Sequence, residues 1–139
     1  MSAESRMRMK VCELLAALHA VPIENSIASG TPDVNCTLGW LELKYLPRWP
    51  ATVGAVRVDH FTGEQRLWLR RRKAQNGACW VLLRVGNDWL LFDGAWASAH
   101  LGHEDERALK AGALHWWYAR DPVAVELVTA LITSRQFPA

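Results

Sequence analysis

Residues 33–44 read Asp-Val-Asn-Cys-Thr-Leu-Gly-Trp-Leu-Glu-Leu-Lys and place two short runs of strand-forming residues around Leu38-Gly39. This pattern predicts a β-hairpin. With Leu38-Gly39 as the loop, Asp33 lies opposite Lys44. The apolar side chains then share one face of the hairpin: Val34, Cys36, Leu41 and Leu43. The polar ones share the other: Asp33, Asn35, Glu42 and Lys44. A three-residue loop would mix the two sets, so the pattern favours the predicted register.

Apolar periodicity and turn residues predict the elements around this hairpin. Before it we expect a helix over residues 5–20 that stops at Pro22, and a short strand within 23–27. After it we expect a third strand over 55–58 and a helix from its cap at Thr62 to about Asn76. A second hairpin over 78–92 follows, then irregular and partly helical structure over 94–120, and a last helix from Asp121-Pro122 to about Ser134.

The composition is that of a globular protein. The chain has 139 residues, 50% hydrophobic and 22% charged, which suits one α+β domain over residues 1–139. No apolar run approaches the roughly 18 residues that span a bilayer, and the N-terminus lacks the layout of a signal peptide. Three cysteines without regular spacing argue against a disulfide framework or a zinc site. We therefore expect a cytoplasmic protein with no membrane partner.

Positive charge is concentrated in one segment. Residues 61–84 carry six basic residues and one acidic residue, which indicates a local patch for a polyanion. Within it, Arg66, Arg70 and Lys73 recur at helical spacing, with Arg71 beside them. These four residues are candidates for contacts to a DNA backbone. The alternative is a solvated helix face.

The polar face of the first hairpin also has two interpretations. It is either a solvated sheet face with an ordinary ion pair between Asp33 and Lys44, or a site that binds a cation. Mg²⁺ prefers hard oxygen ligands, and Asp33 and Glu42 can each supply one.

Two segments of the chain resemble motifs of a known family. Gly30-Thr31-Pro32-Asp33 together with Gly39-Trp40-Leu41-Glu42-Leu43-Lys44 resembles the Pro-Asp…(Asp/Glu)-x-Lys signature of the PD-(D/E)xK nuclease superfamily. Residues 62–69 resemble the glutamine-bearing helix motif of its Holliday-junction resolvase and VRR-NUC-type branches. The resemblance covers about residues 5–93. It implies a restriction-endonuclease-like αβββαβ core with a mixed central sheet flanked by helices; residues 94–139 would be a helical extension.

The resemblance also implies roles for individual residues. Mg²⁺, with Mn²⁺ as a substitute, would be bound by Asp33, Glu42 and the backbone carbonyl of Leu43. Lys44 would hold the attacking water or the charge of the transition state. Gln65 would position Lys44 or the scissile phosphate; the alternative is a buried glutamine that caps a loop.

Such nucleases often recruit a second acidic residue upstream. Glu13 lies far from the apolar stripe of the first helix and should face solvent near Arg6 and Lys10. Glu24 precedes the turn that leads to Asp33 and can fold back towards it. We therefore expect Glu24, rather than Glu13, to join the catalytic and metal-binding residues.

The function implied is that of a compact, phage-type, Mg²⁺-dependent DNA endonuclease acting on Holliday junctions or other branched DNA, in a bacterial or phage-infected cytoplasm. A homodimer is expected by analogy, because a junction needs two coordinated cuts. A VRR-NUC-type nickase or flap nuclease is the first alternative. A catalytically inactive DNA-binding accessory protein and a module unrelated to nucleic acid are the others. The aromatic run His115–Tyr118 is expected to pack in the core, to stack bases or to form a dimer contact.

Overall fold

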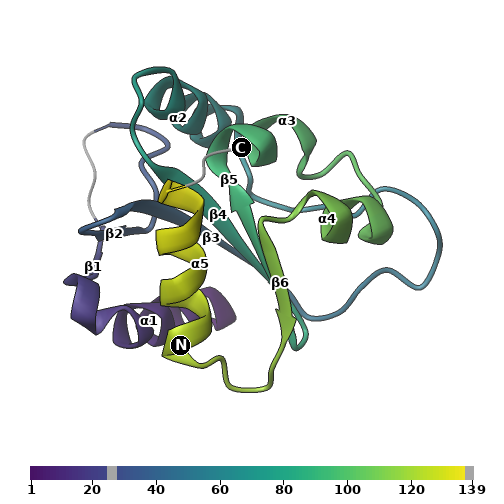
Figure 1. Ribbon diagram of the computed structural model, residues 1–139. Helices are drawn as coiled ribbons and strands as arrows, with labels where there is room; N and C mark the ends of the chain where they lie inside the picture. The colour runs from purple at the N-terminus through teal and green to yellow at the C-terminus, as the bar shows by residue number, and fades with distance from the viewer. Residues whose placement is uncertain (25–27, 137–139) are drawn as a thin grey trace.

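The computed structural model describes residues 1–24 and 28–136 and shows a mixed, six-stranded sheet between two layers of helices (Figure 1). The strands lie side by side in the order in which they occur in the sequence. They are β1 (Val21–Pro22), β2 (Val34–Cys36), β3 (Gly39–Leu46), β4 (Cys79–Val85), β5 (Asp88–Asp93) and β6 (His115–Tyr118). Only the neighbouring strands β3 and β4 are parallel; a helix connects them. The predicted class, an α+β fold with a mixed sheet flanked by helices, is confirmed.

The helices divide between the two faces of the sheet. On one face lie α1 (Ala3–Leu14) and α5 (Ala124–Gln136), and a 3₁₀ turn (Ala16–Leu18) follows α1. On the other face lie α2 (Gly63–Ala74), α3 (Gly94–His100) and α4 (Glu106–Gly112). None of the helices in the described part of the chain has the length and apolarity needed to cross a membrane.

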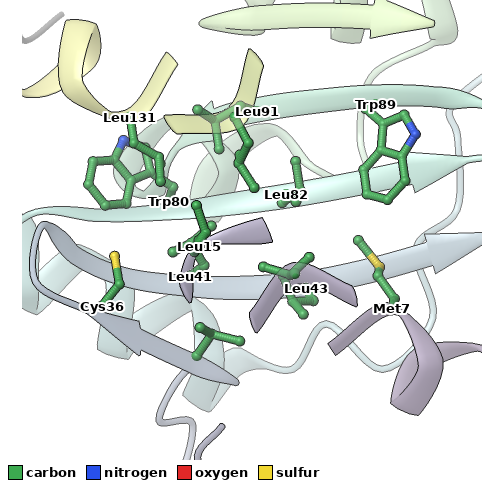
Figure 2. Close-up of a cluster of buried hydrophobic side chains, with 13 residues drawn as sticks. Met7, Leu15, Cys36, Leu41, Leu43, Trp80, Leu82, Trp89, Leu91 and Leu131 are labelled. Carbon is green, nitrogen blue, oxygen red and sulfur yellow. The ribbon is translucent and has the colours of Figure 1, made fainter. Parts of the chain in front are cut away.

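Two hydrophobic cores hold these layers together, one on each face. Figure 2 shows the core beneath α1 and α5, where Leu15 and Leu131 meet side chains from neighbouring strands. The strands contribute alternate residues: Leu41, Leu43, Trp80, Leu82, Trp89 and Leu91. The residues between them in β3 face the opposite layer, as strand periodicity requires. This alternation directs Glu42 and Lys44 towards α2.

The second helix begins where the sequence predicts. Thr62 Oγ1 accepts a hydrogen bond from the backbone of Gln65, and the Gln65 side chain accepts one from the backbone of Thr62, forming a capping box. The helix ends at Ala74, close to the predicted Asn76. The first helix is shorter than expected: α1 ends at Leu14 and its 3₁₀ extension at a left-handed His19, before Pro22 is reached.

The first hairpin forms, but in a different register from the predicted one. Val34 pairs with Leu41 and Cys36 with Gly39, so Thr37-Leu38 is the turn and Gly39 belongs to β3. The reason is tertiary: a Cβ on residue 39 would lie 2.4 Å from the carbonyl oxygen of Ala78, at the start of β4. Glycine is needed for this close approach of two strands, and not for the turn. The two faces keep their predicted composition because the register differs by an even number of residues.

Three further expectations are corrected. Residues 55–58 form no strand, although Val56 is buried and its N–H donates to Glu104. The strand that precedes the hairpin is β1, at Val21–Pro22; part of the predicted span, residues 25–27, lies outside the described residues. The C-terminal part is not purely helical, because His115–Tyr118 pairs with β5 as β6. Its aromatic residues are strand formers that alternate between the two faces.

Candidate active site

The structure brings four of the predicted site residues together at one cavity. Asp33 immediately precedes β2, Glu42 and Lys44 lie two residues apart on β3, and Gln65 lies in the first turn of α2. The cavity has a volume of about 180 Å³. Leu43, whose backbone carbonyl is a predicted ligand, also lines the cavity. Four further lining residues were not suggested by the sequence: Glu4, Ser5, Arg8 and His60.

Glu42 is the most buried ionisable residue of this cavity, with 2% of its surface exposed. Burial, and then the adjacent Asp33 carboxylate, raise the pKa of Glu42 to about 8, although Lys44 acts in the opposite direction. At neutral pH and without a cation, the Glu42 carboxyl group is therefore mostly protonated. Glu42 Oε1 has no hydrogen-bond partner among the described residues, which is costly for a buried oxygen. Such an oxygen is suited to bind a ligand.

Asp33 and Lys44 are both fixed by short contacts. Asp33 Oδ2 accepts a hydrogen bond of 2.8 Å from the backbone N–H of Leu43, which ties the loop before β2 to β3. Lys44 Nζ lies 3.2 Å from Glu42 Oε2 and donates to the carbonyl oxygen of His60 at 2.9 Å. The ion pair between Asp33 and Lys44, which the alternative interpretation of a solvated sheet face implied, is not formed; Lys44 contacts Glu42 instead.

Gln65 connects this ammonium group to α2. Its Oε1 accepts hydrogen bonds from Lys44 Nζ at 3.1 Å and from the backbone N–H of Thr62 at 2.9 Å. The side chain therefore contacts Lys44, and it caps the start of α2 rather than a loop carbonyl. One amide oxygen couples the start of α2 to the position of the lysine.

The acidic residue contributed from upstream is neither of the two considered. Glu24 is exposed beyond β1 and does not line the cavity. Glu13 faces solvent, and its Oε2 lies 3.9 Å from Lys10 Nζ. Glu4 lines the cavity instead, because α1 begins at Ala3 and turns its first residues towards β3. The sequence alone places Glu4 at the rim of the apolar stripe, three residues before the buried Met7. It does not show whether the side chain reaches the cavity.

The four predicted DNA-binding residues differ in their surroundings. Arg66 is partly buried, donates to the Ser98 carbonyl at 3.0 Å and lies over Phe61, so it fastens α2 to α3. Lys73 forms an ion pair of 2.8 Å with Asp93. Arg70 and Arg71 are exposed. The structure thus separates two structural cations from two that are open to solvent.

The donor atoms at this cavity fit Mg²⁺. Asp33 and Glu42 supply hard carboxylate oxygens, one of them buried and unpaired, and Leu43 lines the same cavity. No group of three or more His, Cys, Asp or Glu side chains converges in the described part of the chain. The protein would therefore supply two carboxylates, and water or substrate oxygens would complete the shell, as is usual for Mg²⁺.

Comparison with models of known protein families gives no match, and no curated protein matches the sequence. The functional argument therefore depends on the geometry of the cavity.

Proposed function

We propose that this protein is a Mg²⁺-dependent endodeoxyribonuclease that hydrolyses phosphodiester bonds in branched DNA. The observation that carries the proposal is the buried Glu42 carboxyl in contact with Asp33, with one unpaired oxygen and with Lys44 at 3.2 Å. The order of elements from α1 to β4 is a helix, three strands, a helix and a strand, which agrees with the core that the sequence resemblance implies.

The residues have separate tasks in this proposal. Asp33 and Glu42 hold the cation, with the backbone carbonyl of Leu43 as a further ligand. When bound, Mg²⁺ makes its water more acidic and neutralises charge on the phosphoryl group. Hydrolysis forms a bond between phosphorus and the water oxygen and breaks one bond between phosphorus and a sugar oxygen, which leaves with a proton.

Lys44 stabilises the negative charge that develops on the phosphoryl oxygens. Its ammonium group has three N–H donors and contacts three acceptors in the structure: Glu42, His60 and Gln65. Glu42 is also a ligand of the cation in this proposal, so its contact is the one that a phosphate or water oxygen would replace. The other two contacts keep the ammonium in place as this exchange occurs.

We also propose that the active form is a homodimer, built on the open edge of β6. This strand pairs with β5 alone among the described residues. Ala119 N–H donates to Asn87, so the main-chain groups of Trp116 and Tyr118 point to the open edge. Their side chains are 47% and 73% exposed. Antiparallel pairing of two β6 strands about a two-fold axis would place Trp116 of one copy opposite Tyr118 of the other.

The direct test is cleavage of linear, flapped and four-way DNA by the purified protein in the presence of Mg²⁺. Wild-type protein should cut, and Asp33→Asn should abolish cutting, while its amide oxygen still accepts from Leu43 and preserves the fold. Asp121→Asn, at an exposed aspartate far along the chain from the cavity, is the matched control and should cut at the wild-type rate. Cleavage that is independent of Mg²⁺ or unaffected by Asp33→Asn would exclude the proposal.

A further inference from the structure

A second, larger hollow lies along α2 beside the candidate active site. It is a groove of about 720 Å³ whose wall includes Glu64, Leu67, Trp68, Arg71 and Arg72. Glu64 lines this groove and the next residue, Gln65, lines the catalytic cavity. The two hollows therefore meet at the first turn of α2.

The turn that leads to Asp33 lies between the groove and the cavity. Gly30 has a φ of +82°, and a Cβ at this position would be 2.4 Å from the carbonyl oxygen of Glu64. Only glycine allows the turn to lie this close to α2. A single strand of nucleic acid that follows the groove over this turn would reach Asp33 directly.

Aromatic and aliphatic groups form part of the groove wall. Trp68 contacts Trp40 edge-to-face with ring centroids 5.3 Å apart, which fixes the orientation of its indole. The Arg72 guanidinium lies 4.5 Å from the Trp68 ring centroid and 5.5 Å from that of Trp40. Leu67, one residue before Trp68, is 38% exposed. The wall is thus rigid, partly apolar and cationic at the same time.

The positive charge of the groove is available to a ligand. Arg71 and Arg72 are exposed and form no ion pair with a carboxylate in the described part of the chain. This contrasts with Lys73 on the same helix, which is neutralised by Asp93. A polyanion can therefore bind Arg71 and Arg72 without breaking an ion pair, although the Arg72 guanidinium also lies over the Trp68 ring.

We infer that this groove binds an unpaired nucleotide of a single strand that branches from the duplex being cut. The inference rests on the proposed nuclease function. The volume lies within the roughly 300–1,000 Å³ typical of small-ligand sites, which is room for a base and its sugar. The base stacks against the wall at Leu67 and Trp68, and Arg71 and Arg72 contact the adjoining phosphates. The phosphates of a duplex backbone would contact the two arginines but would leave the apolar wall exposed to solvent.

The test compares binding of two DNAs in EDTA, so that no cleavage occurs. One is a blunt duplex and the other is the same duplex with a short single-stranded tail, made with each polarity. Fluorescence anisotropy with the full-length wild-type protein should show tighter binding of one tailed DNA, on the order of tenfold, as stacking of one base provides. Equal affinity for all the DNAs would overturn the inference.

Variants assign the preference to the groove. Trp68→Leu should abolish the preference for the tail, and Trp68→Phe should retain most of it. Leu67→Glu, at a more exposed position, should also abolish it and does not depend on the packing of Trp68. Arg71→Glu should weaken binding of the tailed DNA more than binding of the blunt DNA. Arg107→Glu, at an exposed arginine on α4, is the matched control and should leave the preference unchanged.

If these groove variants weaken binding of the blunt and the tailed DNA equally, the groove contacts only the duplex backbone and the inference fails. The outcome is separable from that of the nuclease proposal, because binding is measured without Mg²⁺. Cleavage without a preference for the tail overturns the groove assignment alone. A preference for the tail without cleavage overturns the catalytic assignment and leaves the groove as a binding site.

Discussion

Lys44 Nζ lies 3.2 Å from Glu42 Oε2, while Oε1 of the same carboxyl group is buried with no hydrogen-bond partner in the described part of the chain. An oxygen of a buried carboxyl group that is left without a partner costs about 1–3 kcal/mol. The arrangement is therefore better explained by a ligand at Oε1 than by stability of the fold.

The raised pKa of Glu42 predicts that the cation-free protein loses stability as the pH rises. The folded-state pKa is about 8 and the ordinary value is 4.5, so the folded protein binds more protons than the unfolded chain between these values. The stabilisation is complete below about pH 4.5 and is lost as the pH passes through about 8. At about 1.4 kcal/mol per pKa unit, the total effect is a few kcal/mol.

Thermal melts in EDTA across this pH range should therefore show a falling melting temperature, and Glu42→Gln should remove much of the fall. Subtracting the two curves cancels the contribution of every other ionisable group, which both proteins share. Mg²⁺ binds the ionised carboxylates, so it should stabilise the wild-type protein more at high pH than at low pH. Parallel curves for the two proteins would show that Glu42 is not the titrating group.

Gln65 should affect catalysis more than stability. Gln65→Ala removes the acceptor for Lys44 and one half of the capping box, whereas Thr62→Ala removes only the other half. Each change should cost about 1 kcal/mol of unfolding free energy, measured by denaturant melts. Only Gln65→Ala should also lower kcat, by up to ~10²-fold, because Lys44 loses its position. If both variants cleave at equal rates, Gln65 is only a helix cap.

The sequence predicts the faces of the first hairpin correctly and its register incorrectly, for one physical reason. Side chains alternate with a period of two, so every even shift preserves the separation of Asp33 and Glu42 from Leu41 and Leu43. The register depends on the contact between Gly39 and Ala78, residues far apart in the chain. The α2 cap is predictable because all its partners lie within one helical turn.

The contributions of Glu4 and β6 could not be predicted in the same way. Whether Glu4 reaches the cavity depends on how α1 packs on the sheet, which is a tertiary property. The run His115–Tyr118 lacks the polar–apolar alternation of a half-buried strand, because all four residues are aromatic. The segment forms a strand because it pairs with β5, and the local sequence pattern does not predict this contact.

Glu4 should support cation binding through the waters that complete the shell, whereas Glu24 should not. Glu4 lines the cavity with Asp33 and Glu42, and Glu24 is exposed outside it. Glu4→Gln should weaken Mg²⁺ binding several-fold in isothermal titration calorimetry and lower the cleavage rate at limiting Mg²⁺. Glu24→Gln is the matched control and should change neither. Both residues are exposed, so each variant should retain stability within about 0.5 kcal/mol. A larger effect of Glu24→Gln would restore the assignment made from sequence.

Tyr118 should determine the oligomeric state. It is 73% exposed on the open edge of β6, where antiparallel pairing of two copies brings aromatic side chains together. Tyr118→Lys places a cation opposite Trp116 of the second copy and diagonal to the same cation there, and charged edge residues are known to prevent strand pairing. Light scattering should show a dimer for the wild-type protein and a monomer for this variant, with an unchanged melting temperature at low concentration. Val53→Lys, at a residue that is 99% exposed elsewhere, is the control and should remain dimeric. A dimeric Tyr118→Lys protein would place the interface away from β6, and a monomeric wild-type protein would exclude the dimer altogether.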